Sequence, residues 1–219
     1  MQPRTSFHVD LTRDLPDILA SFAEKTRYNI RLSQKKGVTV TDASTEKGVQ
    51  TFYKIYEETA KRERFLIHPL SYYQKVRSSL IDKGYGKVFL AYYGSEPIAG
   101  IFIFSFGERV WYMYGASKSS HRNIMPNHAL HWHAMTWAKK KGYKVYDLWG
   151  VPSNPTKGHP LYGVYRFKKG FNGKLVKLIG AYDLPFNKIL YYFLDKGIAF
   201  WQGLRGLIKK GKIEDSLSE

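Results

Sequence analysis

The sequence contains no cysteine, which excludes disulfide frameworks, thiolate nucleophiles and cysteine-ligated metal centres. Acidic residues are scarce. The 219 residues include 18 Asp and Glu and 35 Lys and Arg, which gives a formal charge of +17. An uninterrupted apolar run of membrane-spanning length is absent, and the N-terminus lacks the pattern of a signal peptide. With 43% apolar and 16% aromatic residues, the chain has ample material for a packed core. We therefore expect a folded, cytoplasmic, strongly basic protein.

The positive charge is concentrated in the second half of the chain. Residues 109–219 carry 19 cations and 6 acids, whereas residues 1–108 carry 16 and 12. Between residues 109 and 182 one acid, Asp147, stands among thirteen Lys and Arg. An ordinary solvated surface mixes both signs. The run therefore predicts a surface for the phosphates of nucleic acid, nucleotide or anionic lipid; the alternative is that the charge serves only solubility.

Hydrophobic periodicity and turn residues predict a mixed α/β chain. Strands are expected at 5–10, 38–40, 87–93, 98–106, 109–114, 144–148 and 174–182, and helices at 14–36, from 44 or 45 onward, 71–83, 124–140, 161–169 and 186–210. Short turns make the three central strands an antiparallel meander. We divide the chain into a domain at 1–185 and a basic amphipathic helix with its tail at 186–219.

The predicted order of elements resembles that of the Gcn5-related N-acetyltransferases, which have a mixed sheet, an antiparallel meander and flanking helices. The resemblance implies a cleft where the strand ending near Tyr114 and the strand ending near Leu148 splay apart. Acetyl-CoA users of this fold normally carry glycines in the turn before the next helix. Here Met125 and Asn127 replace them, and Pro126 removes an N–H donor, so the backbone groups that would bind a pyrophosphate are impaired. We expect no CoA and no other cofactor.

Five motifs resemble those of the Fem family of peptidyl transferases, in the family's order and spacing. They are TRYNIR at 26–31, YGAS at 114–117, HRNIMPN at 121–127, YDLWGV at 146–151 and YRFKKGF at 165–171. The resemblance implies transfer of an amino acid from aminoacyl-tRNA to the stem-peptide amine of a nucleotide-linked or lipid-linked muropeptide precursor. Family members usually carry two domains of this type, and the match covers the second with its tail. A partner supplying the first domain is therefore expected.

The resemblance also implies roles for the last motif. It places Phe167 and Lys168 at the acceptor end of the tRNA, where the Lys168 ammonium would neutralise a phosphate and polarise the ester. Phe167 or Phe171 would stack on the donor or shape its pocket, although both could equally be core residues. The neighbouring cations Arg166 and Lys169 are expected to bind substrate.

Several other candidate site residues each have two possible interpretations. Asp147 ends a predicted strand and either orients the attacking amine or is satisfied by Arg and backbone N–H groups. Trp149 forms an aromatic wall or packs in the core. Arg27 and Arg31 share a helix face, where they clamp a diphosphate or are simply solvated. Arg122 and Asn127 lie at a predicted helix N-terminus, which suits an anion.

His128, His131 and His133 lack a nearby carboxylate and do not all face one way, so we expect no metal. The helix at 186–210 would either lie on an anionic inner membrane surface or pack on the body.

The leading prediction is an aminoacyltransferase of peptidoglycan precursors that uses aminoacyl-tRNA. The alternatives are a non-catalytic basic module that binds tRNA or an anionic surface, and a CoA-dependent N-acetyltransferase.

Overall fold

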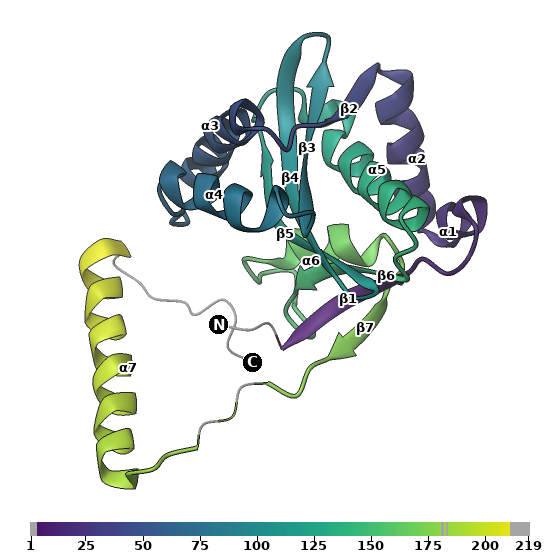
Figure 1. The fold of residues 1–219 in the computed structure, drawn as a ribbon. Helices are drawn as coiled ribbons and strands as arrows, with labels where there is room; N and C mark the ends of the chain where they lie inside the picture. Colours follow the sequence, from purple (N-terminus) through teal and green to yellow (C-terminus); the bar gives the residue numbers. More distant parts are fainter. Residues whose placement is uncertain (1–3, 181, 183, 211–219) are drawn as a thin grey trace.

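The computed structural model describes residues 4–180, 182 and 184–210, with side chains up to Trp201 except Ala199. Figure 1 shows a twisted sheet with helices on both sides. Its strands lie in the order β2-β3-β4-β5-β6-β1-β7. Their bounds are β1 Thr5–Asp10, β2 Val38–Asp42, β3 Gly86–Tyr93, β4 Glu96–Phe106, β5 Arg109–Ser117, β6 Val145–Gly150 and β7 Lys174–Lys177. The helices are α1 Leu15–Ser21, α2 Glu24–Lys35, α3 Glu46–Glu63, α4 Leu70–Val76, α5 Pro126–Lys140, α6 Tyr162–Lys169 and α7 Lys188–Lys210.

The sheet consists of two antiparallel parts that meet at one short parallel ladder. The predicted meander β3-β4-β5 is confirmed, and β1 pairs antiparallel with both β6 and β7. Strands β5 and β6 pair in parallel from Arg109↔Val145 to Trp111↔Asp147. Beyond that point β5 follows β4 to Ser117, while β6 follows β1 to Gly150. The predicted splay and the acyltransferase-type mixed sheet are therefore confirmed.

The helices cover the two faces of the sheet with separate cores. On one face α2 and α5 cover a core that includes Phe89, Leu130 and Tyr146. On the other, α3 and α4 cover a second core around Phe52 and Phe102. Helix α3 begins where the sequence predicts, because the Thr45 side chain accepts the Gly48 N–H at the N-cap position.

Several predicted boundaries were wrong. The single helix expected at 14–36 is two helices, because Phe22 is extended and Ala23 donates its N–H to the Gly170 carbonyl. The strand expected at 174–182 ends at Lys177, which pairs with Thr5 near the start of β1; residue 181 lies outside the described residues. The helix expected at 71–83 ends in a π-helical turn, Arg77–Ile81.

Helix α7 stands apart from the rest of the molecule in Figure 1. Within the described part of the chain, no helix is both long enough and apolar enough to cross a membrane. The division at residue 185 stays a prediction.

Candidate active site

A cavity of about 870 Å³ opens beside the end of β5. One wall is the C-terminal end of α3 and the loop after it, and another wall is α6. The end of β5 and the beginning of α5 close the cavity between them. The lining residues are Tyr56, Thr59, Arg62, Glu63, Arg64, Phe65, Tyr112, Gly115, Ala116, Ser117, Arg122, Asn127, His131, Pro160, Leu161, Gly163, Val164, Phe167 and Lys168.

Lys168 is a buried cation in this cavity, with 6% of its surface exposed. Its Nζ donates to the Gly150 carbonyl at 2.9 Å and lies 3.4 Å from the Trp149 carbonyl, at the end of β6. The ring of Tyr112 lies 5.5 Å from the same nitrogen. Burial lowers the pKa of Lys168 to about 8, and the negative charge of Asp147 partly offsets that effect. The site therefore holds an ammonium group that loses its proton unusually easily.

Neutral polar rings lie next to Lys168. His131 is buried, and its Nδ1 lies 3.1 Å from the Tyr146 hydroxyl. Burial, with the nearby charge of Lys168, lowers the pKa of His131 to about 3, so the imidazole is neutral near pH 7. Burial raises the pKa of Tyr112 to about 12. Lys168 is therefore the titrating group of this trio near neutral pH.

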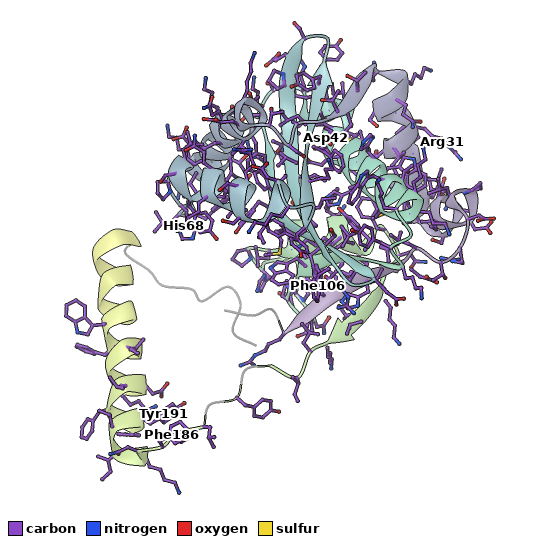
Figure 2. All side chains as sticks on the ribbon, in the orientation of Figure 1. Arg31, Asp42, His68, Phe106, Phe186 and Tyr191 are labelled. Carbon is purple, nitrogen blue, oxygen red and sulfur yellow. The ribbon has the colours of Figure 1, made fainter. Side chains whose placement is uncertain are left out.

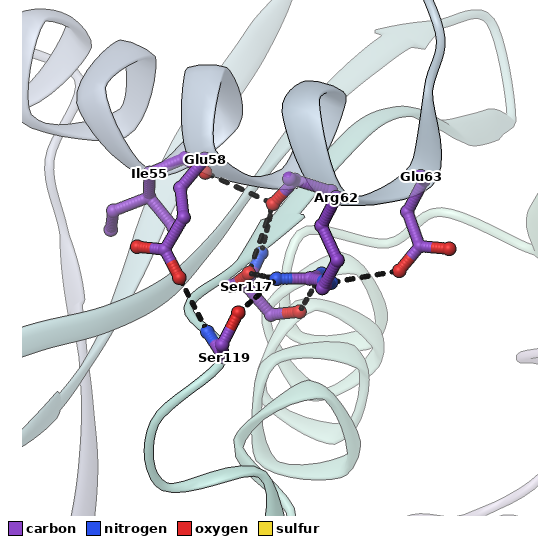
Figure 3. Close-up of polar contacts among 7 residues, drawn as sticks. Ile55, Glu58, Arg62, Glu63, Ser117 and Ser119 are labelled. Carbon is purple, nitrogen blue, oxygen red and sulfur yellow. Dashed lines mark hydrogen bonds and ion pairs between the residues drawn. The ribbon is translucent and has the colours of Figure 1, made fainter.

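The end of β5 is fastened to α3 by the polar contacts drawn in Figure 3. The Thr59 hydroxyl accepts the Ser117 N–H at 2.9 Å and lies 2.9 Å from the Ser117 carbonyl. Arg62 donates to that carbonyl at 2.9 Å, and Glu58 accepts the Ser119 N–H at 2.6 Å. These contacts hold the strand edge and the helix end as one wall of the cavity.

Two predicted anion-binding residues, Arg122 and Asn127, line the cavity at the beginning of α5. A short 3₁₀ turn, Arg122–Ile124, leads into the helix. Met125 has a φ of 58°, a left-handed conformation that a glycine would adopt without strain. Pro126 is the first helical residue, where its missing N–H costs the helix no hydrogen bond.

The α6 residues of the motif at 165–171 lie on two different faces of the helix. Phe167 and Lys168 line the cavity together with Gly163 and Val164, because residues four apart share a helix face. Arg166 does not line it and lies instead over the Tyr162 ring at 6.0 Å. Lys169 likewise lies over the Tyr165 ring at 5.8 Å. Arg166 and Lys169 thus lie outside the cavity lining, and their expected role in substrate binding stays a prediction.

Asp147 also lies outside the cavity lining. Asp147 is 3% exposed, and its carboxylate accepts hydrogen bonds from Ser6 and the Trp149 N–H and lies 3.0 Å from His8 Nε2. Burial alone would raise the pKa of Asp147, but the His8, Ser6 and Trp149 donors bring it below its ordinary value. The reading of a carboxylate satisfied by its neighbours is the one the geometry supports. Trp149 itself has a φ of 61° and contributes its carbonyl near Lys168.

Three further predicted residues do not line the cavity. Arg27 donates to the carbonyls of Ala20 and Phe22, so it caps the end of α1. Arg31 is exposed on α2, on the side of the molecule away from α3 in Figure 2. Phe171 is completely buried against Phe22 and His131. These positions are a helix cap, a surface residue and a core residue.

Sequence reasoning missed most of the α3 wall. Arg62 and Arg64 reach the cavity from a Lys-Arg-Glu-Arg run whose basic character was a usable signal. Tyr56 and Tyr112 carried no signal of their own. From the sequence, His131 was considered only as a possible metal ligand. Among the residues that the structure describes, no group of three or more His, Asp and Glu could hold a metal ion.

Comparisons with known proteins identify the family to which this chain belongs. A model of the FemAB family matches residues 1–94 and 82–196. The chain is 24% identical to the Lipid II:glycine glycyltransferase of Staphylococcus haemolyticus, over 90% of this chain and 62% of that protein. The crystal structure of FemX superposes with a TM-score of 0.83 at 22% identity, covering 89% of this chain and 65% of that one. The C-terminal domain of a putative lysylphosphatidylglycerol synthetase from Agrobacterium fabrum gives 0.57 at 13% identity, covering 79% and 57%. The chain thus spans less than two thirds of these relatives, and because the family model matches most of its length, it belongs to the FemAB family.

Proposed function

We propose that this chain transfers an amino acid from aminoacyl-tRNA to the stem-peptide amine of a peptidoglycan precursor. The observation that carries the proposal is the buried Lys168 ammonium in an 870 Å³ cavity, within a chain of the FemAB family. The named activity of the staphylococcal relatives, Lipid II:glycine glycyltransferase, supports glycine as the amino acid and lipid II as the acceptor.

The chemistry needs little more than positioning and charge. The neutral amine attacks the ester carbonyl and a tetrahedral oxyanion forms. Its collapse breaks the ester C–O bond, and the leaving ribose oxygen takes up the proton that the amine loses. Protonated Lys168 would stabilise that oxyanion or a terminal phosphate from inside the cavity, where low polarity strengthens its charge. Phe167 lies beside it and offers a ring on which a terminal base can stack.

The positive residues around the cavity suit the phosphates of both substrates. Arg62 and Arg64 stand on one wall and Arg122 on another, so an anion between them would meet charge from both sides. The neutral His131 and Tyr112 leave Lys168 as the charge nearest the reacting ester. We place this reaction in the cytoplasm, where aminoacyl-tRNA is available.

A transfer assay with radiolabelled glycyl-tRNA tests the proposal. The full chain is mixed with lipid-linked or nucleotide-linked muropeptide, alone and with the first domain of a family member supplied as a separate chain. We expect label on the stem peptide, and a Lys168→Met variant that transfers about 10²–10³-fold more slowly. Lys174→Met, at the exposed start of β7, is the matched control and should transfer normally. Failure of transfer under all four conditions would contradict the proposal.

Calorimetry separates this function from the CoA alternative. Pro126 and Met125 replace the N–H and glycine that a pyrophosphate site normally uses. We expect tRNA to bind and CoA not to bind. Micromolar CoA binding without tRNA binding would favour an N-acetyltransferase instead, and tRNA binding without any transfer would favour a non-catalytic module.

A further inference from the structure

Asp147 lies outside the cavity lining, but its carboxylate is bonded to the turn that holds Lys168. Asp147 Oδ1 accepts the Trp149 N–H at 2.8 Å, which closes a turn between residues two apart at the end of β6. The carbonyls of Trp149 and Gly150, immediately after that bond, lie 3.4 Å and 2.9 Å from Lys168 Nζ. Two successive backbone carbonyls therefore approach one ammonium group directly beyond the carboxylate.

Trp149 has a backbone conformation that needs support. Its φ of 61° lies in the left-handed region, which is unfavourable for a residue with a large side chain. Asp147 is itself fixed in place, because the Ser6 hydroxyl donates to its Oδ1 and His8 Nε2 lies 3.0 Å from its Oδ2. Arg109 Nη1 lies 3.7 Å from the same Oδ2. Side chains of β1 and β5 thus hold the carboxylate, and the carboxylate holds the turn.

The same carboxylate acts on Lys168 through its charge. Helix α5 presents the neutral His131 to Lys168, and β5 presents the neutral Tyr112. Burial lowers the pKa of Lys168 to about 8, and the negative charge of Asp147 acts in the opposite direction. Asp147 therefore favours the protonated form of a lysine that it does not touch.

We propose that Asp147 is a positioning residue for the transfer reaction, which holds the turn at Trp149 so that two carbonyls fix the Lys168 ammonium in the cavity. This inference rests on the proposed function, in which protonated Lys168 stabilises the reacting ester. Two variants separate the bond from the charge. Asp147→Asn keeps an oxygen that can accept the Trp149 N–H but removes the charge, whereas Asp147→Ala removes both.

Nuclear magnetic resonance tests the link between Asp147 and Lys168 without any substrate. The full chain carries lysine labelled with ¹³C at Cε, and the Lys168 signal is the one that Lys168→Met lacks. We expect that signal to titrate at about pH 8 in the wild type and at lower pH in Asp147→Asn, because the negative charge is gone. Asp10→Asn is the matched control, since the exposed Asp10 accepts the Thr12 N–H at 2.8 Å in the same kind of turn. A wild-type midpoint in Asp147→Asn would overturn the proposal.

The transfer assay, run below the midpoint of Lys168, tests the turn. We expect Asp147→Asn to retain a kcat within about threefold of wild type, and Asp147→Ala to lose about tenfold to a hundredfold in kcat with little change in KM. Asp10→Ala should transfer normally, and circular dichroism verifies that each variant is folded. A wild-type rate in Asp147→Ala, or an equal loss in both Asp147 variants, would refute the positioning role. If Asp147→Ala does not fold, the titration of Asp147→Asn decides. Absence of transfer by the wild type would instead contradict the proposed function, and the titration would still test the link between the two residues.

Discussion

Lys168 shows how a buried charge opposes stability. Its ammonium is buried with two backbone carbonyls as hydrogen-bond partners and a tyrosine ring nearby. Carbonyl dipoles compensate a buried charge only in part, which is why burial lowers the pKa of Lys168 to about 8. The folded state therefore bears a free-energy cost below that pH, and the unfolded chain, with an ordinary lysine, does not.

The first prediction concerns that cost. Between pH 8 and about 10.5 the folded protein has lost the Lys168 proton while the unfolded chain still binds it, so the stability contribution of this group rises with pH. At pH 7 Lys168→Met should be more stable than wild type by about 1–3 kcal/mol. That advantage should shrink as the pH rises toward 10. Urea unfolding at several pH values measures it, and a pH-independent difference would count against a buried charge.

The second prediction concerns Gly115, which lies at the cavity beside Tyr112. A Cβ on Gly115 would stand 1.8 Å from the Tyr112 hydroxyl oxygen, so Gly115→Ala must displace that ring from Lys168. We expect a loss of about 1–3 kcal/mol in the free energy of unfolding. Gly163→Ala is the matched control, because its Cβ would meet nothing within 4 Å, and in α6 it should stabilise by about 0.5–1 kcal/mol. Equal effects of the two changes in urea unfolding would disprove the steric argument.

Only some of the individual residues that line the cavity were predicted from the sequence. Phe167 and Lys168 were found through a motif, and the structure brings both to the cavity. Arg166 and Lys169 were grouped with them because they are adjacent in sequence, but a helix turns adjacent residues to different faces. Arg62 belongs to the same cavity from a helix about one hundred residues earlier in the chain. The basic run around Arg62 was a local signal of charge, but its place in the same cavity as Lys168 depends on the tertiary fold.

Among the elements, α3 and β5 form the most precisely connected pair. The Thr59 hydroxyl accepts the buried Ser117 N–H and has one proton to share between the carbonyls of Ile55 and Ser117. Arg62 supplies a further donor to Ser117. The hydroxyl of one helical residue thus positions the strand end that borders the cavity.

Removing that hydroxyl is the third prediction. Thr59→Val keeps the shape of the side chain but leaves the buried Ser117 N–H without its acceptor, at a cost of about 1–3 kcal/mol. Thr51→Val makes the same change in the same helix, where the hydroxyl bonds only the Lys47 carbonyl and is partly exposed. It should change stability by less than about 0.5 kcal/mol. Urea unfolding compares the two variants, and a Thr59→Val effect no larger than that of Thr51→Val would contradict the proposed coupling.

Elements with strong local signals were predicted best. The meander strands are apolar runs separated by short turns, and α3 has its Thr45 cap, so the starts of these elements were located to within a few residues. The break between α1 and α2 was missed because it depends on Ala23 bonding Gly170, a residue far along the chain. The predicted β7 was too long for a similar reason. The strand pairs antiparallel with β1, so it ends where β1 begins.

For the whole molecule, the charge asymmetry gives the fourth prediction. If the net +17 chain binds tRNA through phosphates, its affinity should fall by about tenfold or more between about 50 and 200 mM salt. Arg122→Gln should reduce the slope of log affinity against log salt by about one. Arg77→Gln, a cation already paired with Asp82 at 2.7 Å, should leave the slope unchanged. Filter binding measures both, and a salt-independent affinity would exclude a phosphate surface.

The short ladder between β5 and β6 has a mechanical consequence for the whole molecule. Each part of the sheet is held by longer antiparallel ladders, so a bending force is borne mainly by three residue pairs. The cavity spans that joint, since its α3 wall is fastened to β5 while Lys168 of α6 is bonded to the end of β6. A molecule held between these walls would cross-link the two parts. We therefore expect a bound molecule to restrain the sheet at its short parallel ladder.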